Sequence, residues 1–66
     1  MLSYRPLFKM LEQRGISKMK FKNDVGISNA TLAKFGKGEA VSLTTVEKIC
    51  KTYNCKIKNV VKYIND

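Results

Sequence analysis

The chain has 66 residues, and its 13 Lys and Arg against five Asp and Glu give a formal net charge of +8 without any histidine. This length supports one small hydrophobic core, so we predict a single domain over residues 1–66. The excess of positive charge favours a polyanionic partner, nucleic acid first of all, although a Lys-rich composition can also serve solubility alone. Few acids and no histidine leave no obvious general acid–base groups, which argues against an enzyme.

The sequence offers no stretch of about 20 apolar residues, so we expect no membrane-spanning helix. The segment MLSYRPLFKM carries a proline and charges where a signal peptide has an apolar core, and this favours a cytoplasmic location. Cys50 and Cys55 are too few for a structural zinc site, which usually takes four ligands, and disulfides are uncommon in the cytosol. We interpret both as small core residues and expect no metal or cofactor.

Capping signals divide the first part of the chain into short elements. A helix is predicted over residues 5–14, because Pro6 suits its first turn and Gly15 suits its end. Its inward side chains recur at helical spacing and are Leu7, Phe8 and Leu11. The preceding segment MLSY is either a frayed end or a short strand that pairs with the C-terminal segment KYIN.

The central stretch SKMKFKNDVGISNATLAKF has the form of two helices joined by a tight turn. Ser17 is expected to cap a helix over 18–25, Gly26 to supply a positive φ, and Ser28 to cap a helix over 29–36. The apolar side chains expected to lock the two helices together are Phe21, Val25, Ile27, Leu32 and Phe35. This pattern predicts a helix-turn-helix, a motif that places its second helix in the DNA major groove.

Two further helices are predicted in the last third of the chain. Ser42 caps the fourth, and Asn54 is a suitable left-handed residue at its end. Its inward stripe consists of Val46, Ile49, Cys50 and Tyr53. A short fifth helix is expected over 57–62, with an apolar side made of Ile57, Val60 and Val61.

The segments ISKMKFKNDVGISNATLAKFGKG (16–38) and VSLTTVEKICKTYNC (41–55) resemble the Cro/C1-type, or XRE, helix-turn-helix family of phage and bacterial repressors. The resemblance covers nearly the whole chain. It implies an all-α, five-helix, lambda-repressor-like DNA-binding domain, to which the terminal strand pair would be an addition. It also implies a sequence-specific regulator of transcription, a repressor, that binds double-stranded DNA. The chain departs from the family at Lys18, Lys22 and Gly36, where Gln, a small residue and Glu are frequent.

The resemblance also assigns roles to individual residues. Those that match base-reading positions are Ser28, Asn29, Ala30 and Lys34. Asn can bond the edge of adenine, Lys can meet guanine, and Ala can touch a thymine methyl group. Phosphate contacts are expected from Lys18, Lys20, Lys22, Thr31, Lys37, Ser42 and Thr44. For Asn29 the alternative is an ordinary first-turn position, for Thr31 a contact to the preceding turn, and for Ser42 a purely capping role.

One small domain with few base-reading groups would bind a half-site weakly, so we expect a homodimer that assembles through the C-terminal region 57–64. A different class of function stays open, because Ala30 and Ala33 give the recognition helix a short-side-chain face. This alternative is a protein-interaction or antitoxin-like accessory module that keeps the helix-turn-helix fold. Single-strand RNA binding is less favoured, since the aromatics on inward stripes leave only Tyr4 and Tyr63 for stacking.

Overall fold

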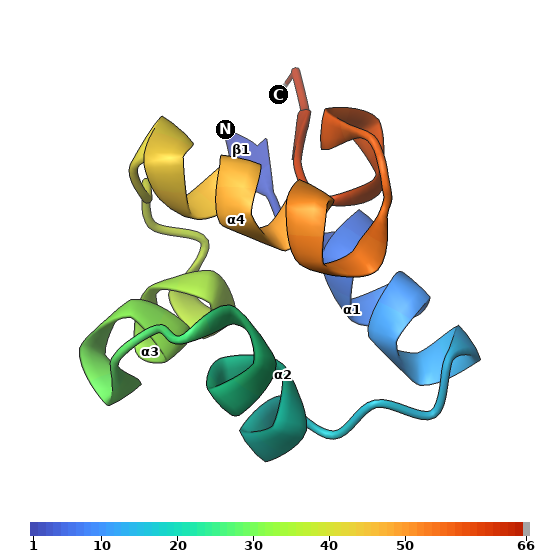
Figure 1. Ribbon diagram of the computed structural model, residues 1–66. Coiled ribbons are helices and arrows are strands. Elements are labelled where there is room, and N and C mark those ends of the chain that lie inside the picture. The colour runs from blue at the N-terminus through green and yellow to red at the C-terminus, as the bar shows by residue number, and fades with distance from the viewer. Residues whose placement is uncertain (66) are drawn as a thin grey trace.

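The computed structural model describes residues 1–65, which form four α-helices, one 3-10 turn and a two-stranded sheet (Figure 1). In chain order the elements are β1 (Leu2–Ser3), α1 (Arg5–Gln13), α2 (Lys18–Val25), α3 (Asn29–Lys37), α4 (Leu43–Tyr53), η1 (Ile57–Asn59) and β2 (Lys62–Tyr63). The first three predicted helices agree with these bounds to within one residue at each end. None of the helices in residues 1–65 is long and apolar enough to cross a membrane.

Serine caps begin three of the helices, as the sequence predicts. The side chains of Ser17, Ser28 and Ser42 each accept the backbone N–H of the residue three positions on, at 3.1 Å. The predicted left-handed residues are also confirmed, with φ 77° at Gly26 after α2 and φ 50° at Asn54 after α4. Each cap satisfies backbone groups that a helix end leaves without an intrahelical partner.

Two aromatic contacts link the helices around Phe21 of α2, whose side chain is fully buried. Its ring meets that of Phe35 of α3 edge-on, with centroids 5.8 Å apart, and stacks on Tyr53 of α4 at 6.3 Å. The other buried core side chains are Tyr4, Leu7, Met10, Leu11, Val25, Val46, Ile49 and Val60. The core therefore draws on every α-helix, and it fixes the helix-turn-helix pair against α1 and α4.

Tyr4 differs from its sequence expectation, because it is not available for stacking on a nucleic acid. Its side chain is only 4 % exposed, and its ring packs edge-on against Phe35 with centroids 4.8 Å apart. The hydroxyl donates to the backbone carbonyl of Glu39 at 2.6 Å. The residue lies directly before α1, outside the helical periodicity, so no stripe in the sequence marks it as inward.

The predicted fifth helix over 57–62 is wrong in length and type. Only Ile57–Asn59 coil, as a 3-10 turn, and the Asn59 side chain accepts the backbone N–H of Lys56 at 3.1 Å. Val60 then enters the core with no exposed surface, whereas Ile57 stays 60 % exposed. The N–H groups of Val60 and Val61 both donate to the Ile57 carbonyl, and β2 begins at Lys62, which the predicted helix had included.

The strand pair predicted for the two termini is confirmed. Strands β1 and β2 are antiparallel, with Leu2 opposite Tyr63 and Ser3 opposite Lys62. Outside the strands, the N-terminal ammonium group of Met1 donates to the Ile64 carbonyl at 2.8 Å, and the Ile64 N–H donates to the Met1 carbonyl at 2.8 Å. Two residues per strand are marginal alone, so this sheet depends on packing over the helices.

Candidate nucleic-acid interface

A three-residue turn fixes the angle between α2 and α3. After Val25, the N–H groups of Gly26 and Ile27 both donate to the Lys22 carbonyl, at 2.9 and 3.1 Å. Ile27 and Leu32 are half-buried and pack against the core, as the sequence predicts. The turn is thus held by backbone bonds on one side and apolar contacts on the other. These contacts hold α3 in a fixed orientation.

Helix α3 packs against the rest of the protein along one side only. Phe35 is its single buried residue, with Leu32 and Thr31 half-buried beside it. The predicted base-reading residues are all exposed, and they are Ser28, Asn29, Ala30 and Lys34. Nine residues at about 1.5 Å rise give a rod roughly 14 Å long. A major groove about 12 Å wide admits such a helix.

A small hollow of about 160 Å³ lies where α3 meets the start of α4. Three of the predicted site residues line it, namely Thr31, Lys34 and Ser42, and Thr45 and Val41 complete it. Hydroxyl groups and one ammonium group therefore gather at a single place beside the outward face of α3. The hollow depends on the packing of α3 against α4, which the sequence alone does not show.

Sequence reasoning missed Thr45 and named its neighbour Thr44, which is exposed but does not line the hollow. A signal was present, because α3 and α4 share the pattern Ser-x-x-Thr at their starts. The Ser28 hydroxyl donates to that of Thr31 at 3.1 Å, and the hydroxyls of Ser42 and Thr45 share a hydrogen bond of 2.9 Å. The third residue of each helix is thus oriented by the cap.

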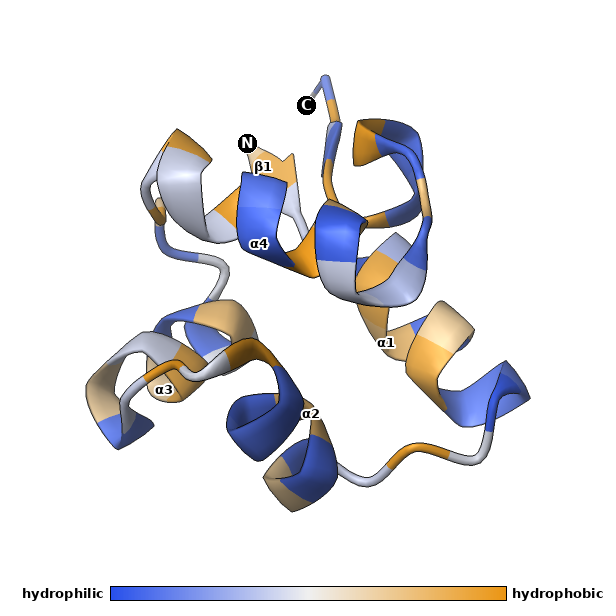
Figure 2. Cartoon of the chain, viewed as in Figure 1, coloured by the Kyte–Doolittle hydropathy of each residue, from blue (hydrophilic) through white to orange (hydrophobic). Residues whose placement is uncertain are grey.

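The three lysines of α2 differ in how far other groups of the protein engage their ammonium groups. Lys18 lies over the Phe8 ring, 5.3 Å from its centroid. Lys20 forms an ion pair with Asp24 at 3.4 Å, which offsets part of its charge. Lys22 is half-buried, so its long stem must lie along the protein surface with its ammonium group outward. Figure 2 shows hydrophilic colour over most of α2.

The helix-turn-helix region is strongly positive. From Arg14 to Lys37 there are six basic residues and one acid, so the local balance is 6 − 1 = +5. The first turns of α3 and α4 contain no acidic residue. Their free backbone N–H groups therefore add positive partial charge where an anion can approach. Lys34 and Lys37 extend this field along α3.

A single buried side of α3, an exposed opposite side and a positive rim around it define a DNA-binding helix-turn-helix. This fold and surface are those of a DNA-binding transcriptional regulator. Comparisons with known proteins agree with this class. A model of the Cro/C1-type HTH DNA-binding domain matches residues 7–66. The chain belongs to the Cro/C1-type helix-turn-helix family, as the sequence resemblance predicts.

Two similar proteins carry related descriptions. The uncharacterized HTH-type transcriptional regulator YozG of Bacillus subtilis (strain 168) is 37 % identical over 59 residues, which cover 86 % of this chain and 70 % of that protein. The crystal structure of the transcriptional regulator VanUg, Form II, is similar with a TM-score of 0.94 and 37 % identity. That likeness covers 98 % of this chain and 87 % of that chain.

Proposed function

We propose that α3 enters the major groove of double-stranded DNA and that Ser28, Asn29, Ala30 and Lys34 face the base edges. The observation that carries this proposal is the free outward face of α3, bordered by the hollow at the start of α4. Asn29 follows the cap directly, where a recognition helix makes its base contacts. Its amide can donate to and accept from adenine at once, and Lys34 can meet guanine one turn further along.

Phosphate contacts in this proposal surround that helix. The hollow offers the Ser42 and Thr45 hydroxyls, the Lys34 ammonium group and the free N–H groups of α4 to one phosphate. Other phosphates meet the side chains of Lys18, Lys20, Lys22, Thr31, Lys37 and Thr44. Lys20 is the weakest of these because Asp24 already pairs with it. Residues 1–66 would act together as one Cro/C1-type domain.

We further propose that the chain represses transcription, because a domain seated on its site excludes other proteins from the same base pairs. A reporter gene behind the preferred site tests this. Expression should fall when the unchanged chain is supplied and should recover with Asn29→Ala. Expression that rises with the unchanged chain would reverse the proposed sign of regulation.

Two variants test the proposed contacts on α3. Asn29→Ala should relax preference at one base pair and cost about 1–3 kcal/mol on the preferred site, measured by fluorescence anisotropy. Lys37→Ala should weaken all sequences alike and reduce the salt slope by about one unit. Lys9→Ala is a matched control, since it removes an exposed lysine from α1, outside both the proposed interface and the proposed dimer region. If Asn29→Ala and Lys9→Ala behave alike, the assignment of α3 is wrong.

A homodimer through the C-terminal region is part of this proposal. Ile57 is 60 % exposed and Tyr63 is 70 % exposed, and both lie in the predicted region 57–64. Two copies related by a two-fold axis would present their α3 helices to half-sites about 34 Å apart. Val60 of the same region is buried in the core and is not available.

Sedimentation of two matched variants tests the dimer. Ile57→Lys should shift the chain to monomer at concentrations where the unchanged chain is dimeric. Met19→Lys alters an apolar side chain of similar exposure, 59 %, on α2, and should leave the dimer intact. A monomer for the unchanged chain at high concentration would contradict the proposal.

A protein-interaction module remains the second candidate, and one observation favours it. Ala30 and Ala33 are both exposed on α3, and short apolar side chains read few bases. Under this alternative the chain would capture a partner protein, and its affinity for duplex DNA would depend on neither Asn29 nor the DNA sequence.

A further inference from the structure

The two cysteines of the chain meet where α4 ends. The left-handed residue Asn54 follows the helix, and its N–H donates to the Cys50 carbonyl. The N–H of Cys55 donates to the same carbonyl at 3.0 Å. This is the bond of a Schellman-type cap, in which the residue after the left-handed position packs against the fourth residue back from the helix end. In this chain those two residues are Cys55 and Cys50.

The surroundings of the thiols agree with this contact. Both cysteines are half-buried and pack against the core. Burial raises the pKa of the Cys55 thiol, the neighbouring Cys50 thiol raises it further, and the guanidinium of Arg14 acts in the opposite direction. The Cys55 thiol therefore keeps its proton at neutral pH.

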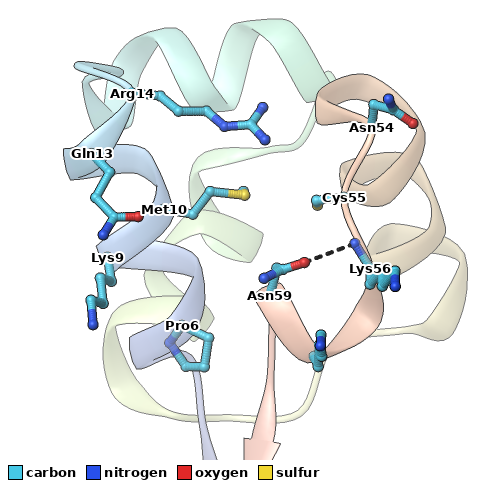
Figure 3. Close-up of a pocket in the computed structure, with 10 residues that line it drawn as sticks. Pro6, Lys9, Met10, Gln13, Arg14, Asn54, Cys55, Lys56 and Asn59 are labelled. Carbon is cyan, nitrogen blue, oxygen red and sulfur yellow. Dashed lines mark hydrogen bonds between the residues drawn. The ribbon is translucent and has the colours of Figure 1, made fainter.

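Cys55 can also be reached from outside. It lines an open hollow of about 560 Å³ between α1 and the segment 54–59, with Met10 and Arg14 among the residues on the α1 side (Figure 3). Apart from Pro6, the remainder of the wall is polar and is formed by amide and lysine side chains. A small polar reagent can therefore approach Cys55, whereas Cys50 is not among the residues that line the hollow.

We propose that Cys50 and Cys55 are a redox-active pair that closes to an intrachain disulfide by exchange with a low-molecular-weight disulfide such as oxidised glutathione. In the first step Cys55 loses its proton, its sulfur attacks the reagent, the reagent S–S bond breaks and one thiol leaves. In the second step Cys50 loses its proton and attacks the Cys55 sulfur, which expels the second thiol. The protein loses two electrons and two protons, and one reagent disulfide becomes two thiols.

A disulfide between Cys50 and Cys55 would constrain the end of α4, which packs against α2 of the helix-turn-helix. Tyr53 lies within the loop that the disulfide closes, and it stacks on Phe21 and donates its hydroxyl to Asp24 of α2 at 3.2 Å. Helix ends fray most readily, so a bond across this end should stabilise the native chain. We expect the midpoint of thermal unfolding to rise on the order of 10 °C in the oxidised form. A lower midpoint in the oxidised form would show that the disulfide distorts the native structure, and would contradict the proposal.

The test is oxidation of the full chain with oxidised glutathione, followed by an acid quench and intact mass measurement. The expected product has lost two hydrogens, carries no glutathione and reverts with dithiothreitol. Cys50→Ser and Cys55→Ser are matched controls. Cys50→Ser should stop at a single mixed disulfide on Cys55, whereas Cys55→Ser should react little, because Cys50 does not line the hollow. Circular dichroism establishes that each variant is folded.

A second arm separates native geometry from mere closeness in sequence. The same exchange is run in urea, where the Schellman-type cap is lost. The ratio of closed disulfide to mixed disulfide should be at least about tenfold higher in the native chain, because the fold holds the two thiols together. An equal or lower native ratio would overturn the proposal, as would native chain that accumulates only glutathione adducts or does not react.

Discussion

Replacing Gly26 by Ala should lower the free energy of unfolding, whereas replacing Gly36 by Ala should raise it. Gly26 ends α2 at φ 77°, a conformation that costs a residue with a Cβ about 1–2 kcal/mol. Gly36 lies inside α3 and has no positive φ. A Cβ at either position would meet nothing within 4 Å, so steric clash contributes to neither result. The difference between the two variants therefore isolates the backbone requirement of the turn.

The expected magnitudes follow from these conformations. Gly26→Ala should lower the free energy of unfolding by about 1–2 kcal/mol. Gly36→Ala should raise it by about 0.5–1 kcal/mol, because alanine loses less backbone entropy in a helix. For a domain of this size, 1 kcal/mol shifts the thermal midpoint by about 4–8 °C. The two variants should thus fall on opposite sides of the unchanged chain.

Urea unfolding followed by far-ultraviolet circular dichroism measures both variants against the unchanged chain. Equal slopes against urea would show that only stability has changed. Two variants that shift in the same direction would refute the conclusion that the turn at Gly26 needs a left-handed residue and that α3 continues through Gly36.

Two tyrosines give further predictions. Tyr4→Phe removes the hydrogen bond to Glu39 and should cost about 1 kcal/mol in urea unfolding, and no measurable cost would show that this bond contributes nothing. Burial, and then the Asp24 carboxylate, raise the pKa of Tyr53 from 10.0 to about 12. The neutral Tyr53 hydroxyl therefore stabilises the folded protein fully below pH 10. This contribution to the free energy of unfolding should fall by about 1.4 kcal/mol per pH unit between pH 10 and 12. The difference in unfolding free energy between the unchanged chain and Tyr53→Phe should follow this slope, and a flat difference would contradict it.

Local chemistry explains why so much of the fold was predictable from the sequence. Serine caps and a glycine at the turn act within a few residues, so they fix where α2, α3 and α4 begin and end. The family pattern then supplied the arrangement of the helices. Its match over residues 7–66 confirms the family, while the roles given to individual side chains stay predictions.

Predictions from the sequence were wrong where contacts between distant parts of the chain determine the local structure. Val60 and Val61 fit a helix in the sequence, but their N–H groups both donate to the Ile57 carbonyl, and the chain then enters β2 at Lys62 after one 3-10 turn. Tyr4 is buried because Phe35 and Glu39 come to it from elsewhere in the chain. Such contacts join residues more than 30 positions apart, beyond the reach of local periodicity.

The candidate interface was predictable in its exposed face and not in its geometry. Helical spacing from Phe35 shows which residues of α3 point outward. The hollow that joins Lys34 to Ser42 needs the crossing of α3 and α4, and the pairing of Lys20 with Asp24 is an i, i+4 contact that charge counting overlooked.

The most direct test of the central claim is fluorescence anisotropy of the unchanged chain with a labelled mixed-sequence DNA duplex across a range of salt concentrations. If about five phosphates are contacted, log K should fall against log salt with a slope of roughly −4 to −5. That result would support α3 seated in DNA with its surrounding phosphate contacts. Failure to bind at low salt, despite the net charge of +8, would contradict the DNA-binding account and favour a protein partner.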